Sequence, residues 1–359
     1  MTDTTFIDEK FMRRALQLAS LGEGNVSPNP MVGAVVVVDG KIIGEGFHRI
    51  CGEAHAEVNA INSVKDKSLL EKSTLYVTLE PCSHWGKTPP CSKLIIEKKI
   101  PNVVIGTLDP FPEVSGRGVK MLNQAGVNVK SGILEKECKE LNKIFFTSLL
   151  NQRPYVILKW AQTADGYMDR HREEVDDKPL IISNQINSIA VHKLRSEVDA
   201  IMVGTTTAEK DNPSLTVRRW DGKNPVRVFL DKNLRVNSKN SLLDGSVPTL
   251  VFTEKQAANR TNVEYITVQF NSELINNILF ELNKRNIRSL MVEGGAKLLS
   301  SFIEKGLWDE ARVETSMISI ENGVEAPLLK GKIDSVCFDD ESLVNHYRNR
   351  VDTMIFDCF

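Results

Sequence analysis

The sequence predicts two α/β domains in one chain. Its 359 residues exceed what one hydrophobic core usually serves. Short apolar strands alternate with amphipathic helices along most of the chain, which is the pattern of α/β folds. A polar joint that contains Pro154 interrupts this alternation midway, over residues 151–154. We therefore place a domain boundary there and expect domains over residues 1–150 and 151–359.

The first half opens with a helix and a hairpin. Apolar residues recur at helical spacing over residues 7–21. Two apolar runs, 32–38 and 41–47, flank Asp39-Gly40, which favours a tight hairpin because glycine accepts positive φ. Helices and strands then alternate, which predicts a mixed sheet with helices on both faces. We expect helices over 56–64, 92–99, 118–124 and 134–149, and strands over 74–78, 103–106 and 127–131.

The second half repeats the fold class without repeating the sequence. It begins with an apolar strand over residues 155–161. Further strands are predicted over 200–203, 226–230, 249–252, 289–292 and 311–315, and helices over 187–195, 274–284 and 297–305. Residues 169–178 are rich in charge and have no period, so we predict a mobile surface loop there.

Composition argues against several classes of protein. The 45 Lys and Arg residues are balanced by 47 Asp and Glu, so no net field attracts the chain to nucleic acid or anionic lipid. No apolar run approaches the roughly 20 residues of a membrane-spanning helix, and the first residues lack a secretory signal. Six cysteines are too few and too scattered for a disulfide scaffold. We expect a cytoplasmic protein that binds neither nucleic acid nor membrane.

The most informative residues are His55, Glu57, Cys82 and Cys91. One imidazole and two thiolates suit zinc, and three protein ligands leave the fourth tetrahedral position for water, as in catalytic sites. Each cysteine lies just before an expected helix start, where free N–H groups favour a thiolate. Residues two apart point away from each other in a regular helix, so we predict that His55 and Glu57 occupy an irregular helix entry. Glu57 would then lie beside the water without coordinating the metal and act as its proton shuttle.

The order of these residues matches the signature of zinc nucleobase deaminases, H-x-E followed by P-C-x-x-C. Here, however, eight residues separate the two cysteines. Three alternatives remain. His84 in the intervening loop is a candidate fourth ligand that would close the site, and a binding protein braced by zinc would have such a closed site. A deaminase of nucleic acid is disfavoured by the balanced charge and by the lack of interleaved aromatic and basic residues.

The second half contains neither a G-x-G-x-x-G nor a Walker motif. A weaker candidate is the glycine pair Gly294-Gly295, which follows a predicted strand and precedes a predicted helix. Glycines let a ligand approach the backbone, and the N-terminus of the following helix presents free N–H groups to phosphate. This turn is a candidate cofactor site.

Together these motifs resemble the family of bifunctional riboflavin-biosynthesis deaminase/reductases. In the first half the resemblance is carried by residues 28–36, 55–57, 78–84, 86–91 and 115–118, and in the second by 158–166, 203–207, 211–218 and 293–295. It implies a cytidine-deaminase-like first domain and a dihydrofolate-reductase-like second domain. It also implies zinc-dependent deamination of a ribosylated diaminopyrimidinone phosphate, followed by NADPH-dependent reduction of the ribosyl chain to ribityl.

Carried over by motif, the resemblance implies a role for each site residue. In the deaminase half, His55, Cys82 and Cys91 would bind Zn²⁺, Glu57 would shuttle the proton, and the substrate would be bound by Asn29, His48, His84 and Lys87. In the reductase half, the substrate would be bound by Arg195, Leu215, Arg218 and Glu293. NADPH would be bound by Lys159, Gln162, Thr207, Asp211, Gly294, Gly295, Ala296, Lys297 and Leu298.

From the residues alone, an ordinary structural or surface role remains possible for some of these positions. Asn29 is equally a turn residue, Lys87 a solvated cation and His48 a core histidine. Arg195 could be a cation at a helix C-terminus and Arg218 a surface charge at the end of a strand. Lys159 and Asp165 are the nearest candidates for a proton donor in the reductase half.

The chain also departs from the family pattern in the reductase half. Residues 177–183 replace a Gly-Asp-Ser-like turn and a Trp, and Ala164 replaces the usual Leu before Asp-Gly. A deaminase with an inactive reductase-like half is therefore a further alternative, and a homo-oligomer is left open.

Overall fold

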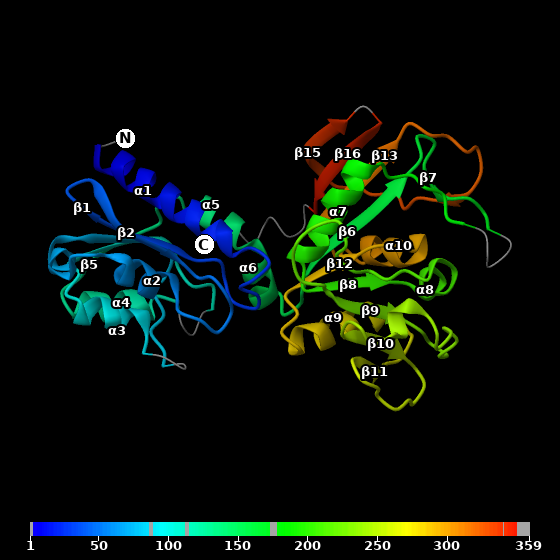
Figure 1. The fold of residues 1–359 in the computed structure, drawn as a ribbon, viewed down its shortest axis with the longest axis horizontal. Coiled ribbons are helices and arrows are strands. Elements are labelled where there is room, and N and C mark those ends of the chain that lie inside the picture. The colour runs from blue at the N-terminus through cyan, green and yellow to red at the C-terminus, as the bar shows by residue number, and fades with distance from the viewer. Residues whose placement is uncertain (1–2, 86–88, 112–114, 173–177, 340, 350–359) are drawn as a thin grey trace. The chain divides into compact units, whose positions relative to one another are not determined.

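The computed structural model of the chain describes residues 3–85, 89–111, 115–172, 178–339 and 341–349 (Figure 1). By its internal contacts the chain divides into two compact units, Met1–Gln152 and Arg153–Phe359. Over the described ranges, no helix combines the length and apolar character needed to cross a membrane.

Unit 1 is built on the mixed five-stranded sheet that the sequence predicts. Its strand order is β2-β1-β3-β4-β5. The hairpin strand β1 is antiparallel to β2 and β3, whereas β3, β4 and β5 are parallel. The strands are β1 (Gly33–Val38), β2 (Lys41–Phe47), β3 (Thr74–Leu79), β4 (Asn102–Thr107) and β5 (Asn128–Ser131).

Helices cover both faces of this sheet, with α1 and α5 on one side and α2, α3 and α4 on the other (Figure 1). They are α1 (Asp3–Ala19), α2 (Ala56–Ser63), α3 (Cys91–Glu97), α4 (Arg117–Gln124), α5 (Glu135–Leu141) and α6 (Lys143–Leu150), with 3-10 turns Ser20–Gly22 and Lys67–Lys72. The single helix expected over 134–149 is wrong. Asn142 interrupts it, because its side-chain amide bonds the backbone N–H and C=O of Met31, each at 2.8 Å.

Unit 2 contains a nine-stranded sheet in the order β11-β10-β9-β8-β12-β6-β13-β16-β15. The strands from β11 to β13 are parallel, and β16 and β15 add an antiparallel hairpin. The six strands predicted for this half are confirmed as β6, β8, β9, β10, β12 and β13, while β7, β11, β14, β15 and β16 were not predicted. The strands are β6 (Tyr155–Gln162), β7 (Tyr167–Asp169), β8 (Ala200–Val203), β9 (Val226–Leu230), β10 (Thr249–Thr253), β11 (Val263–Thr267), β12 (Ser289–Val292), β13 (Glu310–Ser316), β14 (Val324–Glu325), β15 (Lys332–Asp339) and β16 (Ser342–Arg348).

The helices of unit 2 pack on this sheet around a core that includes Leu158, Phe252 and Phe302. They are α7 (Gln185–Glu197), α8 (Thr205–Asp211), α9 (Leu274–Lys284) and α10 (Ala296–Glu304), with a 3-10 turn Ser241–Leu243. The surface loop expected over 169–178 is wrong at its start. Asp169 ends β7, and the partly buried Arg172 side chain pairs with Asp169 and Asp211. Residues 173–177 lie outside the described residues.

Candidate zinc site and cofactor cavity

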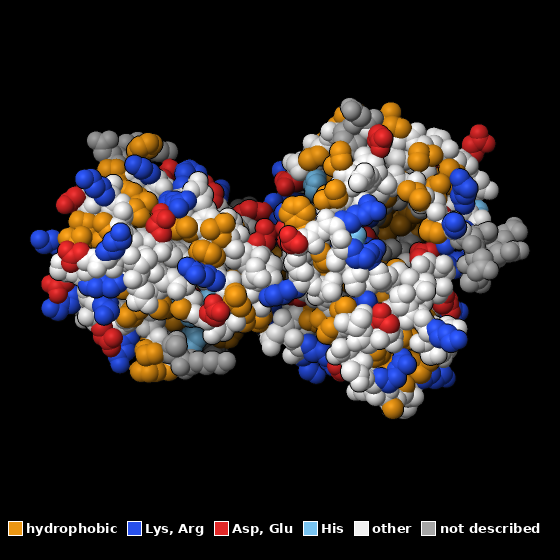
Figure 2. Space-filling view, in the orientation of Figure 1, with side chains coloured by type: hydrophobic (Ala, Val, Ile, Leu, Met, Phe, Trp, Pro, Cys, Tyr) orange, Lys and Arg blue, Asp and Glu red, His pale blue; other side chains and the backbone are white. Residues whose placement is uncertain are grey.

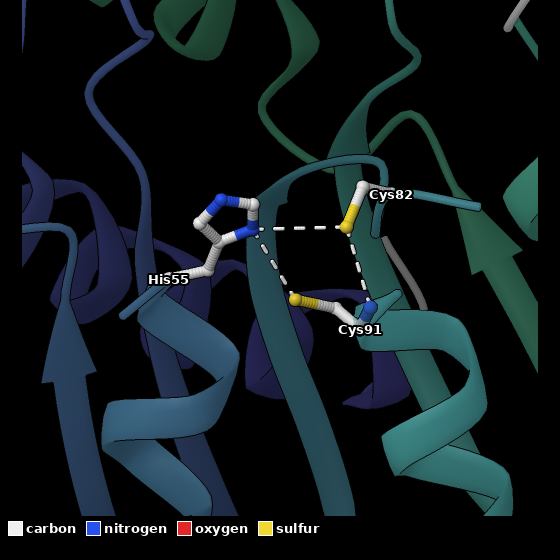
Figure 3. A group of neighbouring side chains, drawn as sticks. All are labelled: His55, Cys82 and Cys91. Carbon is white, nitrogen blue, oxygen red and sulfur yellow. Dashed lines mark hydrogen bonds between the residues drawn. The ribbon is translucent and has the colours of Figure 1, made fainter. Parts of the chain in front are cut away.

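Three ligand atoms converge between the starts of α2 and α3 (Figure 3). His55 is the N-cap of α2, with extended backbone angles (φ −71°, ψ 165°), and Cys91 is the first residue of α3. Cys82 follows the end of β3. His55 Nδ1 lies 3.7 Å from Cys82 Sγ and 3.4 Å from Cys91 Sγ, and the three atoms all lie within 4.8 Å of one another.

These separations fit one tetrahedral zinc ion. Bond lengths of about 2.3 Å to sulfur and about 2.0 Å to nitrogen give an N···S separation of about 3.5 Å at the tetrahedral angle. Among the described residues, only His55, Cys82 and Cys91 form such a group. His84 is exposed and is not a member, so the closed four-ligand site that it would create is not formed.

Hydrogen bonds at the start of α3 shift the pKa values of the two thiols. The Cys91 N–H donates to Cys82 Sγ at 3.3 Å. A hydrogen bond from the Cys91 thiol lowers the pKa of Cys82 to about 4, whereas sharing this proton with Cys82, together with burial, raises the pKa of Cys91. Cys82 does not itself precede a helix, contrary to the sequence prediction. Its carbonyl instead accepts hydrogen bonds from the N–H and hydroxyl of Ser92 in α3.

Glu57 lies beside this group without belonging to it. It is the second residue of α2 and is only 3% exposed, so His55 and Glu57 occupy the helix entry as predicted. Burial raises the pKa of Glu57 to about 7, and the negative charge of Cys82 adds to this shift. The Glu57 carboxyl also interacts with the Cys91 thiol. A carboxyl group that titrates near neutrality beside an open metal position can both accept and donate a proton.

Two predicted substrate residues meet next to His55. Asn29 Nδ2 lies 3.1 Å from His48 Nε2, and His48 Nδ1 lies 3.2 Å from the Ala54 carbonyl. The second contact assigns the ring proton to Nδ1, so that Nε2 accepts from Asn29. Burial lowers the pKa of His48, which keeps the ring neutral. The His48 ring meets the His55 ring edge-on, with centroids 5.6 Å apart. Lys87 lies outside the described residues.

Glu80 positions the Cys82 loop and was missed by the sequence analysis. Its buried carboxylate accepts backbone N–H bonds from Asp109, Gly116, Gly118 and Val119 at 2.9–3.2 Å. At Gly118 a Cβ atom would lie 2.2 Å from the Pro81 carbonyl, so only glycine allows this close approach. The signal in the sequence was an acidic residue two positions before a ligand cysteine, at the end of an otherwise apolar strand.

In unit 2, a cavity of about 1270 Å³ opens beyond the carboxyl ends of β6, β8 and β12. This is the edge at which α/β sheets bind ligands. Figure 2 shows this unit hollowed next to Lys and Arg side chains. Nine predicted site residues line the cavity: Lys159, Thr207, Asp211, Glu293, Gly294, Gly295, Ala296, Lys297 and Leu298.

The glycine turn has the geometry that a phosphate cradle needs. Gly294 and Gly295 have φ of 124° and 81°, and α10 begins at Ala296. The first value lies in a region that essentially only glycine occupies. Residues 294–298, which include the start of α10, line the cavity, and the first N–H groups of a helix are the ones that can bind a phosphate.

Glu293 is the centre of a charged network at the cavity wall. Its carboxylate lies 3.4 Å from Lys159 Nζ and 2.8 Å from the Arg195 guanidinium. Burial alone would raise the pKa of Glu293, but Arg195 and Lys159 outweigh burial and hold it below its usual value. Arg195 also donates to the Thr216 carbonyl at 3.2 Å, which ties it to the segment that carries Leu215.

Some predicted residues are not part of the cavity wall. Arg195, Leu215, Arg218 and Gln162 are absent from its lining. Arg218 donates to the hydroxyls of Ser214 and Thr216, and Gln162 accepts from the indole N–H of Trp160 at 2.8 Å. Asp165 binds the Thr163 hydroxyl and the N–H groups of Ile320 and Glu321, so it holds a turn and is no candidate for a proton donor.

Two protein-family models match the chain, one in each unit. A model of the cytidine and deoxycytidylate deaminase zinc-binding region matches residues 6–107, and a model of the RibD C-terminal domain matches residues 154–316. The riboflavin biosynthesis protein RibD of Aquifex aeolicus is 43% identical over 311 residues, which cover 84% of this chain and 85% of that protein. The chain belongs to the RibD family. It therefore carries the deaminase and the reductase of riboflavin biosynthesis.

Other RibD proteins extend the match over most of the chain. RibD of Bacillus amyloliquefaciens is 41% identical over 335 residues, 91% of this chain and 89% of that protein. A solved deaminase/reductase structure from Thermotoga maritima is 40% identical, with a TM-score of 0.86, and covers 96% of this chain and 99% of its own. Acinetobacter baumannii RibD has the same TM-score and coverage at 29% identity. The predicted fold class and the family resemblance are confirmed.

Proposed function

We propose that unit 1 deaminates diaminohydroxyphosphoribosylaminopyrimidine and that unit 2 reduces 5-amino-6-(5-phosphoribosylamino)uracil with NADPH. The Thermotoga maritima relative carries both of these activities in its name. The observation that carries the proposal is the three-ligand group His55, Cys82 and Cys91 with the buried Glu57 carboxyl next to it. A structural zinc site has four protein ligands and no use for such a carboxyl group.

In the deaminase unit, zinc supplies Lewis-acid activation of water at neutral pH. Glu57 takes a proton from the attacking water and delivers it to the departing ring amine, which leaves as ammonia. Its position in the first turn of α2, beside Cys91 but outside the ligand group, supports this role. Asn29 and the neutral His48 hold the pyrimidine through ring nitrogens and carbonyls, and we assign His84 and Lys87 to substrate binding as well.

In the reductase unit, NADPH supplies the hydride. The N–H groups at the start of α10 hold its phosphates behind Gly294 and Gly295, and Thr207 and Asp211 contact its ribose from α8. Glu293, held by Lys159 and Arg195, accepts hydrogen bonds from the pyrimidine edge. The hydride would add to the ribosyl C1′ as the bond between C1′ and the ring oxygen breaks, and the released oxygen would take a proton. Lys159, which lines the cavity, is the candidate donor of that proton.

The phosphate end of the substrate meets arginine in this unit. We assign it to Arg195 and Arg218, next to Leu215, because their planar forks suit phosphate oxygens. Neither residue is among those that line the cavity, so the assignment requires the phosphate to bind beside the lining residues rather than among them. We also propose that the protein works in the cytoplasm, where Cys82 and Cys91 stay reduced and able to bind zinc.

The decisive experiment measures the two half-reactions separately. The purified chain is mixed with the pyrimidine phosphate, and ammonia release and NADPH oxidation are each followed. We expect ammonia first and then NADPH oxidation that depends on the deaminated product. Ammonia without NADPH oxidation would overturn the reductase half of the proposal, and the absence of both would overturn all of it.

A further inference from the structure

Asn59 lies inside α2, although asparagine is a poor helix former. Side chains of a helix lie over the turn on their N-terminal side, so the Asn59 amide reaches back past the start of α2. Its Nδ2 atom donates to the Phe47 carbonyl at 2.8 Å and to the Ala54 carbonyl at 3.2 Å. A side-chain amide has two N–H protons, so these two bonds use both of them.

These two carbonyls directly precede the two histidines of the deaminase site. Phe47 ends β2 and is followed by His48. Ala54 is followed by His55, the N-cap of α2. A peptide group is planar, so a hydrogen bond to the carbonyl of one residue also restrains the Cα atom of the next. One amide group therefore holds the two peptide groups that lead into His48 and His55.

Further hydrogen bonds complete this junction. The His48 N–H donates to the Val32 carbonyl at 2.9 Å, so the peptide group between Phe47 and His48 is bound at both its N–H and its C=O. The Ala54 carbonyl accepts from the Asn59 amide and from His48 Nδ1, each at 3.2 Å. A carbonyl oxygen has two lone pairs, so both are used. Without Asn59, the carbonyl before His48 would lose its bond to α2.

The entry of α2 cannot supply this restraint through its own N-cap. An N-cap side chain usually bonds the first N–H groups of the helix, but His55 makes no such bond because its ring belongs to the zinc group. The end of β2 nevertheless lies directly against α2, since a Cβ atom at Gly46 would be 2.3 Å from the backbone nitrogen of Ala60. Asn59 supplies a polar link across this close contact.

We propose that Asn59 is a positioning residue of the deaminase, which holds His48 in a fixed place relative to the zinc ligand His55. It acts through the two peptide groups and is assigned no contact with substrate or metal. The inference rests on the proposed function, in which His48 binds the pyrimidine. The helix bond from the Asn59 N–H to the His55 carbonyl, at 3.1 Å, does not use the side chain. Loss of the amide should therefore free His48 while α2 and Glu57 keep their places.

The steady-state kinetics of ammonia release test this inference. Asn59→Leu nearly keeps the size of the side chain and removes both donors. We expect the KM for the pyrimidine phosphate to rise about tenfold, as for the loss of one or two hydrogen bonds, with little change in kcat. Asn62→Leu, at an exposed position of the same helix, is the matched control and should keep the wild-type KM. An asparagine with a purely structural role would lower the Tm and leave the KM of the folded variant unchanged.

A double-mutant cycle shows whether Asn59 acts through His48. In a His48→Ala chain the residue to be positioned is gone, so adding Asn59→Leu should lower kcat/KM by less than about twofold. If the two residues acted independently, the tenfold effect of Asn59→Leu would persist in that chain.

Far-UV circular dichroism and bound zinc show whether each variant is folded, and Asn59→Ala provides a second variant. The absence of ammonia release in the wild type would overturn the proposed function and this inference with it. Wild-type turnover with an unchanged KM in the folded Asn59 variants would overturn this inference alone. Independent effects in the cycle, or two variants that both fail to fold, would do the same.

Discussion

The two sites of the molecule are built in different ways. The zinc site places three ligand atoms and one carboxyl group at the starts of α2 and α3, within 4.8 Å for the ligands. The reductase cavity of about 1270 Å³ instead draws its wall from several strand ends, a glycine turn and a charged network. We infer that the first site depends on single atoms for its chemistry, whereas the second spreads ligand binding over many contacts. Substitutions should therefore abolish turnover in the first and shift affinity in the second.

The largest expected effect is the loss of deamination when Glu57 is replaced. Glu57→Gln keeps the size of the side chain and removes its proton-accepting carboxylate. We expect deamination to fall by about 10²–10⁴-fold, the usual contribution of a general acid–base group. Bound zinc should stay unchanged, as should NADPH oxidation when the deaminated product is supplied directly. Ammonia release and elemental analysis measure this. Glu53→Gln, at an exposed position two residues before His55, should have no such effect. Full turnover in Glu57→Gln would remove the assigned proton shuttle.

The next effect tests the glycine turn of the cavity. Alanine in place of Gly294 meets a φ of 124°, a strain of about 1–3 kcal/mol. We expect Gly294→Ala to raise the KM for NADPH by about tenfold, which corresponds to about 1.4 kcal/mol, with unchanged ammonia release. Gly306→Ala is the control, because Gly306 has a φ of 65° in an open turn outside the cavity lining. An unchanged KM in Gly294→Ala would show that the cofactor does not approach this turn.

A smaller effect connects Glu80 with the metal. Glu80→Gln weakens four charge-assisted backbone bonds near Cys82, at a cost of about 1–2 kcal/mol. We expect Glu80→Gln to lose its zinc to a chromogenic chelator several-fold faster than the wild type. Its zinc content before the chelator is added should be normal. Glu71→Gln, at an exposed side chain in the same unit, should release zinc at the wild-type rate. If both variants release zinc alike, Glu80 supports the fold without positioning the ligand loop.

The smallest expected effect is a dependence of stability on pH. The pKa of Glu293 is lowered in the folded state, so its pairing stabilises unit 2 fully above the unfolded value of about 4.3. This stabilisation decreases as the pH falls below the pKa of Glu293 in the unfolded chain. It is lost once the pH has fallen through the lower pKa of Glu293 in the folded protein. Thermal unfolding followed from pH 6 to pH 3 should show a steeper acid loss in the wild type than in Glu293→Gln. If the wild type and Glu293→Gln lost thermal stability equally as the pH falls, the lowered pKa of Glu293 would be contradicted.

The parts that could be predicted from sequence are those with local causes. The strands are apolar runs bounded by turns, and the zinc ligands follow from one imidazole and two cysteines in a fixed order. The helix entry at His55 followed from the 100° turn per residue, which prevents His55 and Glu57 from sharing a helix face.

The features that could not be predicted depend on contacts between segments that are distant in the sequence. The break between α5 and α6 arises because Asn142 bonds Met31, which lies far away in the chain. Glu80 gains its role from N–H groups of the loop after β4, and Asp165 from those at Ile320 and Glu321. The β15–β16 hairpin was missed because its mixed polar and apolar residues lack a clear alternation, with an irregular register after Ile333. No local pattern could have revealed these pairings.

The central claim is that one imidazole and two thiols hold zinc with one position left for water. X-ray absorption spectroscopy at the zinc edge of the purified chain tests it most directly. We predict two sulfur ligands at about 2.3 Å and two lighter ligands at about 2.0 Å, of which only one is an imidazole. A spectrum that requires two imidazoles, as from His84, or that shows no bound zinc would contradict the account.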